Sequence, residues 1–401
     1  MTTFDATEVR LSYANPLVEK LRDEGQLVVG ELTFLMPTSF GFCWGVDRAL
    51  AMVEEARKEH EGRSMWLLSS IIHNPRVNQD LRDKGIRFLK GPLSDEAPED
   101  APTEKLGPSD VVFIPAFSAE IEDMKRLEKN GVQIVDTTCP WVIKPHKRTQ
   151  KYIREGFTVV IHGTVGHDET RATCSLVEAS EGRFVVVHDL EETEILAAAI
   201  EGELDEETLR RGLHDQAFSS VFEFPGDLGR IGIINQTTML ATESRAIGDR
   251  LKTAIALREG DEGLAESFRD FDTICRATQD NQDAAGKVAQ RDPDLFVVVG
   301  GFDSSNTRNL ARVGDAAGVP AFHIEGPECV GESIRHRERN SGAIIETRDW
   351  LPMEGPVTVA FTAGASTPDT ILGMVVEKIA EMRGESLPSN LGGSGPAVDL
   401  L

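Results

Sequence analysis

Three cysteines stand in similar local sequences, each at the start of a predicted helix. Cys43 lies in GFCWGV, Cys139 in TTCP and Cys275 in ICRAT, and each belongs to a different block of the chain. They can meet only if the three blocks close around a common centre. Thiolates hold iron–sulfur clusters, and a helix N-terminus helps to keep a sulfur ionised. The three residues are therefore candidate ligands of one cluster, and the alternative is that they are buried apolar thiols.

The number of cysteines is informative as well. Five cysteines are an odd number in a large chain, which argues against a disulfide framework. We expect Cys174 and Cys329 to be buried thiols. Three protein ligands on a four-iron cluster would leave one iron open for a substrate, which is how catalytic metal sites differ from structural ones.

Polar residues follow the predicted strands at six places in the chain. In open α/β sheets, ligands bind beyond the carboxyl ends of the strands, where a loop leads into the next helix. Six such loops indicate a shared site. They are His73–Pro75, Asp136–Pro140, His162–Thr170, Asn235–Thr238, Gly300–Asn306 and Thr362–Ser366.

Two of these loops have the form that a phosphate group requires. Ser304-Ser305-Asn306 and the segment Thr362–Ser366 combine glycine and hydroxyl residues just before a predicted helix. Free N–H groups and the helix dipole both favour an anion there. Neither loop is a Walker A or a Rossmann motif. The alternative is that the Ser and Thr side chains only cap the helices.

The elements that would position these residues alternate between apolar β-branched runs and longer amphipathic stretches, which is typical of an α/β protein with parallel sheets. Predicted strands cover residues 32–36, 65–72, 111–115, 132–135, 157–161, 184–187, 230–234, 295–299, 321–324 and 357–361. Predicted helices cover residues 46–59, 77–84, 119–130, 145–154, 242–257, 279–290, 305–318 and 369–383. Residues 91–108, 189–229 and 259–267 are expected to be surface loops or an insertion.

Charge limits the partners of the chain. The 401 residues include 42 Lys and Arg against 67 Asp and Glu, and the formal net charge is −25. This balance repels nucleic acids and anionic membranes, so neither is an expected partner. An anionic substrate must instead be held by local N–H groups, hydroxyls, amides or imidazoles. With no membrane-spanning run and no secretory signal in the sequence, we expect a cytoplasmic protein.

One basic stretch stands out against this background. Its residues recur at helical spacing, which usually indicates a solvated helix face. The alternative is a docking surface for an acidic electron donor. The residues are Lys144, Lys147, Arg148, Lys151 and Arg154.

Eight separated motifs make the chain similar to a known family. They are GFCWGVDRA, IIHNPRVNQDL, DTTCPWVIK, GHDET, NQTT, ICRATQDNQ, GGFDSSNT and TAGASTPD. Their order and spacing resemble those of the LytB/IspH family, the 4-hydroxy-3-methylbut-2-enyl diphosphate reductases, from about residue 32 to residue 380. The CPWV and PAF forms and the N-terminal extension resemble the plant and cyanobacterial branch.

The resemblance implies a fold and a reaction. The fold would have three lobes of parallel-sheet βα units around a central [4Fe–4S] cluster, to which each lobe supplies one cysteine. The reaction would be the two-electron removal of the allylic hydroxyl group, which yields isopentenyl and dimethylallyl diphosphates in the methylerythritol phosphate pathway. The expected boundaries are an extension at 1–30, lobes at 31–138, 139–270 (with an acidic insertion at 189–229) and 271–356, a returning strand and helix at 357–384, and a disordered tail at 385–401.

The resemblance also assigns roles to residues. Cys43, Cys139 and Cys275 would bind the cluster, Glu169 would deliver protons, and Thr237 would order that relay. The residues expected to bind the substrate are His73, His167, Thr237, Thr238, Ser304, Ser305, Asn306 and Ser366.

The chain departs from the best-known bacterial pattern at Phe117, where those relatives have a diphosphate-binding histidine. A phenyl ring cannot bind phosphate in this way, and His162 is a candidate replacement, with a structural role as the alternative. The expected partners are a small allylic diphosphate and a ferredoxin- or flavodoxin-type electron donor, for a monomer or homodimer. The alternative function is a non-redox, phosphate-binding α/β transferase or binding protein.

Overall fold

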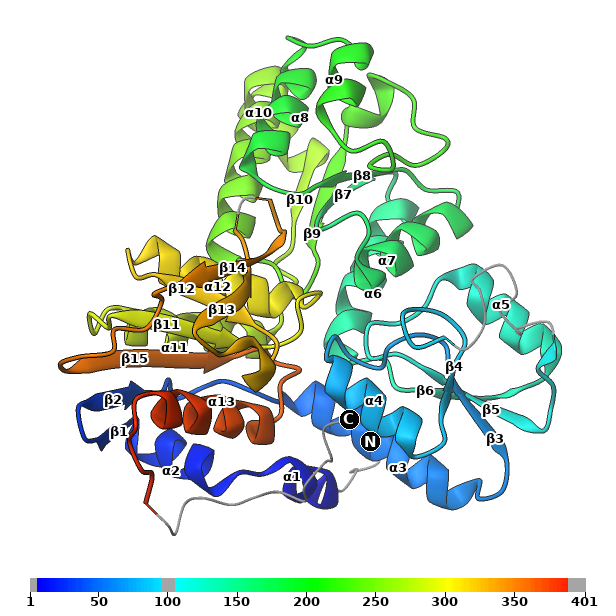
Figure 1. Ribbon diagram of the computed structural model, residues 1–401. Coiled ribbons are helices and arrows are strands. Elements are labelled where there is room, and N and C mark those ends of the chain that lie inside the picture. The colour runs from blue at the N-terminus through cyan, green and yellow to red at the C-terminus, as the bar shows by residue number, and fades with distance from the viewer. Residues whose placement is uncertain (1–5, 95–104, 340, 389–401) are drawn as a thin grey trace. The chain divides into compact units, whose positions relative to one another are not determined.

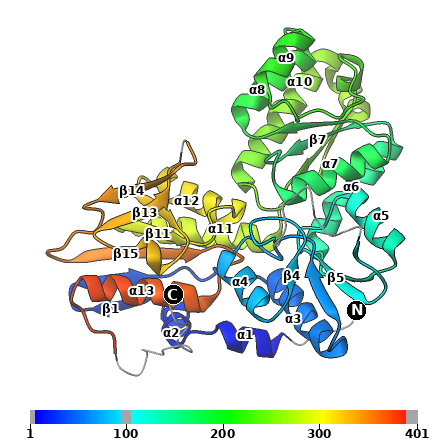
Figure 2. The same ribbon diagram turned by 45° about the vertical axis from the view of Figure 1, so that its right-hand side comes forward.

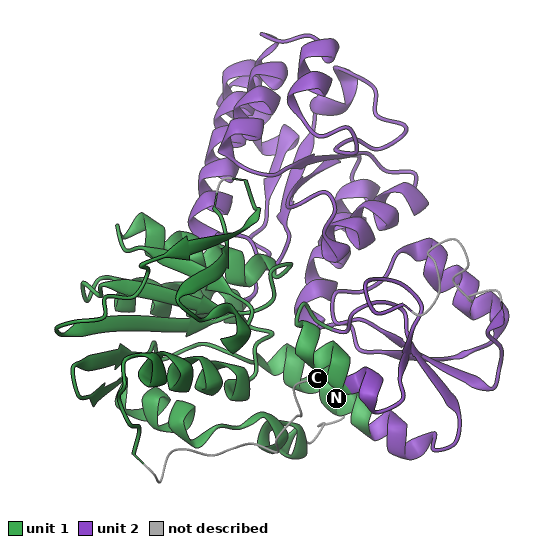
Figure 3. Cartoon of the chain, viewed as in Figure 1, with its two compact units in different colours: residues 1–54, 72–80, 276–401 green, residues 55–71, 81–275 purple. Residues whose placement is uncertain are grey.

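The structure is a computed structural model that describes residues 6–94, 105–339 and 341–388 (Figure 1). The chain divides into two compact units (Figure 3). Unit 1 comprises Met1–Glu54, Ile72–Asp80 and Arg276–Leu401, and unit 2 comprises Glu55–Ile71 and Leu81–Cys275. Strands and helices alternate along both, which confirms the predicted α/β class.

Unit 1 is built on a seven-stranded mixed sheet. Strands β2, β15, β11 and β12 are parallel, whereas β1, β13 and β14 pair antiparallel to their neighbours. The order across the sheet is β1 (Gln26–Val29), β2 (Leu32–Leu35), β15 (Val357–Ala363), β11 (Leu295–Val299), β12 (Ala321–Ile324), β13 (Ser333–Arg337) and β14 (Ile344–Arg348).

Helices cover both faces of this sheet (Figures 1 and 2). Helices α2 (Pro16–Glu24) and α13 (Asp369–Met382) share one apolar core with the sheet, and α11 (Arg276–Ala289) and α12 (Ser305–Ala316) share another. The sequence of α2 explains its bounds. The Asn15 side chain accepts hydrogen bonds from the N–H groups of Leu17 and Val18, and Gly25 ends the helix at a φ of 72°.

Unit 2 contains two four-stranded sheets, both fully parallel. Strands β7, β8 and β9 are buried along their whole length, as their continuous apolar runs require. One sheet has the order β4 (Arg87–Phe88), β3 (Ser64–Leu67), β5 (Asp110–Ile114), β6 (Gln133–Asp136). The other has the order β10 (Phe268–Asp270), β9 (Ile231–Asn235), β7 (Thr158–His162), β8 (Phe184–Val187).

The helices of unit 2 bury their apolar faces on these sheets. Side chains of α6, α7, α8 and α10 belong to one core with β7, β8 and β9. The helices are α5 (Ile121–Asn130), α6 (Pro140–Arg154), α7 (Asp168–Ala179), α8 (Leu190–Glu201), α9 (Glu206–Gly212) and α10 (Ala241–Ser267). Helix α1 (Thr7–Tyr13) belongs to unit 1, and α3 (Trp44–Glu59) and α4 (Pro75–Asp83) run across the division of the chain.

The structure differs from the sequence-based expectation in two acidic segments. Residues 190–201 form α8 rather than a loop, because Leu196 and Ile200 lie one turn apart and bury their side chains in the core of unit 2. Residues 259–267 extend α10 beyond a kink at Gly260, whose φ is 72°.

The sequence predicts an extension at the N-terminal end of the chain and a disordered tail at the C-terminal end. The expected extension at 1–30 contains α1, α2 and β1, and β1 pairs with β2. Most of the tail predicted to be disordered, residues 389–401, lies outside the described residues. Among the helices described, none combines the length and the apolar character needed to cross a membrane.

Candidate active site

The three candidate cluster ligands occupy the same position relative to a helix. Cys139 is the N-cap residue of α6, and Cys43 and Cys275 directly precede α3 and α11. All three side chains are partly exposed. Each backbone N–H group donates a hydrogen bond to a carbonyl oxygen of another loop: 3.2 Å from Cys43 to Ala365, 3.0 Å from Cys139 to Ala116 and 3.0 Å from Cys275 to Thr237.

The other two cysteines have different surroundings. Cys174 lies inside α7 against the core of unit 2, and burial raises the pKa of its thiol to about 12. Cys329 is buried in a short 3-10 helix, where its Sγ accepts a hydrogen bond of 3.4 Å from Arg335. Because metals bind the thiolate, a thiol held neutral, as that of Cys174 is, makes a poor ligand.

In unit 1, the predicted binding residues lie beyond three neighbouring parallel strands. Strands β2, β15 and β11 lead into the loops that contain Cys43, Ser366 and the Ser304–Asn306 segment. His73 joins this group, because its carbonyl oxygen accepts a hydrogen bond of 3.2 Å from Ser366 Oγ. Ser304, Ser305, Asn306 and Ser366 are all buried.

Two glycines allow these loops to approach one another. A Cβ atom at Gly301 would lie 2.5 Å from the carbonyl oxygen of His73, and a Cβ atom at Gly364 would lie 2.1 Å from Thr307 Oγ1. Any residue larger than glycine would therefore push the loops apart.

Hydrogen bonds fix the hydroxyl and amide groups of these loops. Ser304 caps α12, since its Oγ accepts hydrogen bonds from the Thr307 N–H group at 3.2 Å and from Thr307 Oγ1 at 2.9 Å. The capping role considered for this loop is therefore present at Ser304. Asn306 Oδ1 accepts from the Ala365 N–H group at 2.9 Å, and its Nδ2 donates to Thr278 Oγ1 at 3.4 Å. The Asn306 amide thus ties the two glycine-containing loops together.

In unit 2, a buried carboxyl group is held by one threonine. Glu169 lies in the first turn of α7 and is 2% exposed. Its Oε1 accepts a hydrogen bond of 2.8 Å from the Thr237 N–H group, and its Oε2 accepts one of 2.8 Å from Thr237 Oγ1. Burial raises the pKa of Glu169 to about 7, although the two bonds from Thr237 act in the opposite direction. At neutral pH this carboxyl group is therefore present in both protonated and ionised forms.

Thr237 also connects the carboxyl group to one of the cysteines. Its N–H and hydroxyl groups donate hydrogen bonds to the Glu169 carboxyl group, and its carbonyl oxygen accepts a hydrogen bond from the N–H group of Cys275. The loop before Cys275 is fixed to β9 by Thr273, whose hydroxyl group accepts from the N–H of Asn235 and donates to its carbonyl oxygen, each at 2.6 Å. We did not predict a role for Thr273 or Thr278, although both lie close to Cys275 in the sequence.

His167 stands next to this pair as the N-cap residue of α7. Its Nδ1 accepts a hydrogen bond of 3.2 Å from the Glu169 N–H group, so a neutral imidazole carries its proton on Nε2. The Phe117 ring meets the imidazole edge to face, with a centroid distance of 6.0 Å. Phe117 stands where the best-known bacterial relatives have a diphosphate-binding histidine, and in this chain its ring packs against the imidazole of His167.

Thr238 and His162 already have polar partners within the protein. Thr238 Oγ1 accepts a hydrogen bond of 2.8 Å from Gln236 Nε2. His162 is fully buried at the end of β7, with its Nδ1 2.8 Å from Ser244 Oγ, and burial lowers its pKa to about 4. These contacts make His162 a neutral core residue, which is the structural alternative considered above.

The metal site itself remains a prediction. Unit 1 contains Cys43, and unit 2 contains Cys139 and Cys275. In the described part of the chain, no group of three or more His, Cys, Asp or Glu side chains is arranged to hold a metal ion.

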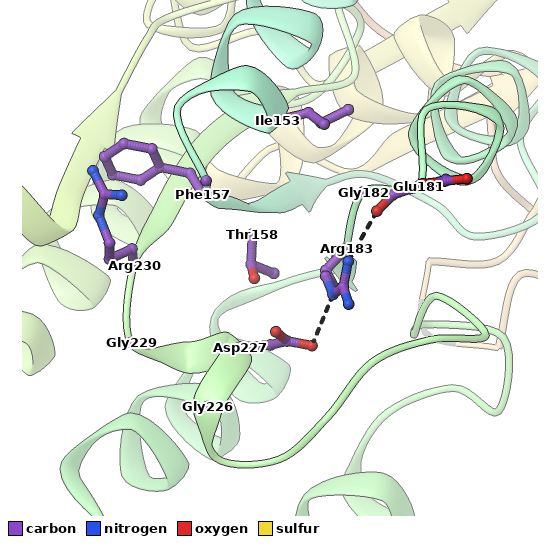
Figure 4. A pocket seen from close by; sticks show the side chains of 11 residues that line it. Ile153, Phe157, Thr158, Glu181, Gly182, Arg183, Gly226, Asp227, Gly229 and Arg230 are labelled. Atoms are coloured by element: carbon purple, nitrogen blue, oxygen red, sulfur yellow. Dashed lines mark hydrogen bonds and ion pairs between the residues drawn. The ribbon is translucent and has the colours of Figure 1, made fainter.

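A cavity of about 300 Å³ lies at the opposite, amino ends of β7, β8 and β9 (Figure 4). Its arginines already have partners. Arg183 lies 3.5 Å from Asp227, and the Arg230 guanidinium lies over the Phe157 ring at 4.2 Å. None of the predicted site residues lines this cavity.

Comparisons with known proteins agree on one family. Residues 35–380 match the LytB protein family. The 4-hydroxy-3-methylbut-2-enyl diphosphate reductase of Gloeobacter violaceus is 40% identical over 382 residues, which cover 94% of this chain and 89% of that protein. The enzyme of the same name from Prochlorococcus marinus is 39% identical over 385 residues, covering 95% and 92%. Both organisms are cyanobacteria, which confirms the predicted branch.

Solved structures show the same similarity. A structure of (E)-4-hydroxy-3-methyl-but-2-enyl diphosphate reductase, the terminal enzyme of the non-mevalonate pathway, is 28% identical and matches with a TM-score of 0.51 over 87% of this chain and 99% of that chain. The Plasmodium falciparum E-1-hydroxy-2-methyl-but-2-enyl-4-diphosphate reductase shares the fold at 19% identity, with a TM-score of 0.63 and coverage of 89% of both chains.

Proposed function

The chain belongs to the LytB protein family, and we therefore propose that it reduces 4-hydroxy-3-methylbut-2-enyl diphosphate in the last step of the methylerythritol phosphate pathway. The substrate takes up two electrons and two protons, its allylic C–O bond breaks, and isopentenyl or dimethylallyl diphosphate forms together with one water molecule. The observation that carries the proposal is the buried carboxyl group of Glu169, which accepts two hydrogen bonds from Thr237. The carbonyl oxygen of Thr237 in turn accepts a hydrogen bond from the N–H group of Cys275. The alternative, a non-redox phosphate-binding protein, leaves this arrangement without a use.

The family uses an iron–sulfur cluster, and we propose a [4Fe–4S] cluster with Cys43, Cys139 and Cys275 as its ligands. The donor chemistry fits, because each thiol lies at a helix start, where a thiolate is favoured, and its backbone N–H group is fixed. When bound, the cluster supplies the electrons that the substrate takes up. Thiolate ligands must also stay reduced, and the cytoplasm is a compartment that keeps thiols reduced.

Glu169 is the proposed proton donor. A hydroxyl group leaves as water only when its oxygen receives a proton, and a carboxyl group with a pKa of about 7 can supply one at neutral pH. Thr237 donates hydrogen bonds to both carboxyl oxygens, so the orientation of the carboxyl group is fixed while the substrate binds. The second proton goes to the allylic carbon framework.

The diphosphate group would be bound mainly by neutral groups. His73, Ser304, Ser305, Asn306 and Ser366 gather beyond the strands of unit 1. The start of α12 adds backbone N–H groups and a helix dipole that favour an anion. In unit 2, the proposed contacts come from His167 through its Nε2–H group, from Thr237 and from Thr238. Binding of this kind does not require a positive field from the whole protein.

We propose that a ferredoxin- or flavodoxin-type protein donates the electrons to a monomeric or homodimeric enzyme. The net charge of −25 supports the expectation that neither a nucleic acid nor a membrane takes part.

The test is an anaerobic assay of the reconstituted protein with the allylic diphosphate and a viologen reduced by dithionite. We expect consumption of two reduced viologens for each molecule of isopentenyl or dimethylallyl diphosphate. Protein that contains about four irons per chain and still does not reduce the substrate would refute the proposal. Protein that binds no iron after reconstitution would refute the cluster assignment.

A further inference from the structure

Helix α6 has a charge pattern unlike that of the chain as a whole. Its sequence, PWVIKPHKRTQKYIR, contains basic residues and no Asp or Glu, in a chain whose net charge is −25. The basic side chains lie at the helical spacing that places them on one side of the helix. We call this side the basic face; it consists of Lys144, Lys147, Arg148, Lys151 and Arg154.

Nearby carboxylates do not neutralise this face. Lys151 lies 3.6 Å from Glu155, at the end of the helix. Among the described residues, Lys144, Lys147 and Arg154 have no carboxylate oxygen within 4 Å, and all three are exposed. The Lys144 ammonium group instead lies 3.4 Å from the centre of the Trp141 ring. The positive charge is therefore presented to the solvent.

The helix dipole accounts for only part of this pattern, because it favours Lys151 and Arg154 in the last turn of α6 but not the basic residues before them. Acidic residues are favourable in the first turn of a helix, because they interact well with its dipole. Helix α7 has Asp168 and Glu169 in its first turn and α8 has Glu191 and Glu192, whereas α6 has no acidic residue there. Lys144 lies just beyond the first turn of α6, where the dipole gives a cation no advantage. Lys144, Lys147 and Arg148 are therefore better explained by a functional reason than by the stability of the helix.

The basic face borders both proposed cluster ligands of unit 2. Cys139 is the N-cap residue of α6 itself. The Arg148 guanidinium group lies 3.8 Å from the centre of the Phe271 ring, and Phe271 belongs to the short segment between β10 and Cys275. A protein that docks on this face would contact the elements that position both thiols.

We propose that the basic face of α6 is the docking surface for an acidic, ferredoxin-type electron donor. The proposal rests on the proposed function, which needs an electron source, and it adds where that source binds. Two reduced donors bind in succession, each is oxidised by one electron, and the two electrons reduce one substrate molecule with uptake of two protons. The negative field of the whole chain repels an acidic partner elsewhere, so the basic face also selects the orientation of docking.

The test compares two triple variants that lose the same charge. The docking variant is Lys144→Gln, Lys147→Gln, Lys151→Gln. The control variant is Lys125→Gln, Lys129→Gln, Lys252→Gln, which changes exposed lysines of α5 and α10 in the same unit. Both retain every proposed catalytic and binding residue. The donor used is a reduced plant-type [2Fe–2S] ferredoxin.

At low ionic strength, we expect the docking variant to lose about 10-fold or more in kcat/KM for ferredoxin, while the control stays near the wild type. The difference should shrink as salt is added, because exposed charges are screened beyond about 10 Å at 0.1 M. With reduced viologen, all three proteins should turn over equally. Calorimetric titration with oxidised ferredoxin should show weaker binding for the docking variant alone, and this measurement does not depend on turnover.

Equal ferredoxin kinetics and equal ferredoxin binding in the two triple variants would overturn the docking proposal. Wild-type protein that is inactive with viologen would instead refute the proposed function. The calorimetric comparison would in that case still decide whether an acidic protein binds the basic face.

Discussion

Replacing Glu169 by Gln should make the protein more stable above neutral pH and the enzyme much slower. Glutamine has nearly the same shape, and its carbonyl oxygen can still accept the hydrogen bond from the Thr237 N–H group. The substitution removes the acidic proton and the buried charge together. Stability and turnover should therefore change in opposite directions.

The size of the stability effect follows from the pKa of this carboxyl group. The pKa rises from 4.5 to about 7 on folding, and this difference corresponds to about 3 kcal/mol. The folded protein binds the extra proton, so the full stability is present below pH 4.5 and is lost as the pH rises through about 7. The Gln variant has no such loss. At pH 8.5 we expect its unfolding temperature to exceed that of the wild type by on the order of 5 °C.

The effect on turnover is expected to be larger in relative terms. Loss of a general acid lowers kcat by about 10²-fold or more. The wild-type rate should fall as the pH rises above about 7, in step with the ionisation of Glu169, and the slow residual rate of the variant should lack this dependence. Viologen oxidation measured from pH 6 to 9, on protein whose cluster absorbance is intact, gives both results.

The matched control is Asp168→Asn, which removes a neighbouring carboxylate that is 31% exposed and lies 3.8 Å from Arg171. We expect this variant to keep the pH dependence of both stability and rate. Near-normal turnover of Glu169→Gln would show that the proton comes from elsewhere. An unchanged unfolding temperature at pH 8.5 would show that the buried carboxylate does not carry the proposed energetic cost.

Three further predictions concern the cluster, the relay and the fold. Serine at any one of the three proposed ligands should abolish the cluster absorbance, whereas serine at either of the other two cysteines should leave it intact. Thr237→Val removes one hydrogen bond that favours the ionised carboxylate of Glu169, so the pH at which the rate falls should rise. Thr237→Ser keeps the hydroxyl group and should return this pH to the wild-type value. Leu196→Ala should lower the free energy of unfolding by about 2–5 kcal/mol, measured by urea denaturation, because Leu196 is fully buried; a change below about 0.5 kcal/mol would mean that α8 is not part of the core.

The sequence predicted the buried parallel strands well and the polar edge strands poorly. Strands β8 and β11 consist entirely of apolar residues, and a continuous apolar run is itself the signal of a buried strand. By contrast, β14 has mostly exposed side chains, so no hydrophobic pattern marks it. The start of α6 was also predicted too late, at Pro145. Proline is usual in the first turn of a helix, which favours a helix that starts at Pro145. In the structure Pro145 is buried inside α6, which begins at Pro140.

The candidate site shows a similar limit. The position of each cysteine at a helix start was readable from local turn residues. The sequence could not show that Asn306 bonds the loop before α13, that Phe117 packs against His167, or that the pKa of Glu169 is raised. Each of these depends on burial or contact between segments that are distant along the chain, and local patterns carry no such information.

The arrangement of strands in unit 1 has a consequence for protein synthesis. Strand β15 lies between β2 and β11, and it is synthesised long after β2. Until β15 leaves the ribosome, β2 has only β1 as a partner in the sheet. At about 5–20 residues per second, this delay lasts on the order of tens of seconds. The continuous segment Leu81–Cys275 of unit 2 is complete by then, so the loops around Cys43 and His73 reach their native partners last, when the chain is almost finished.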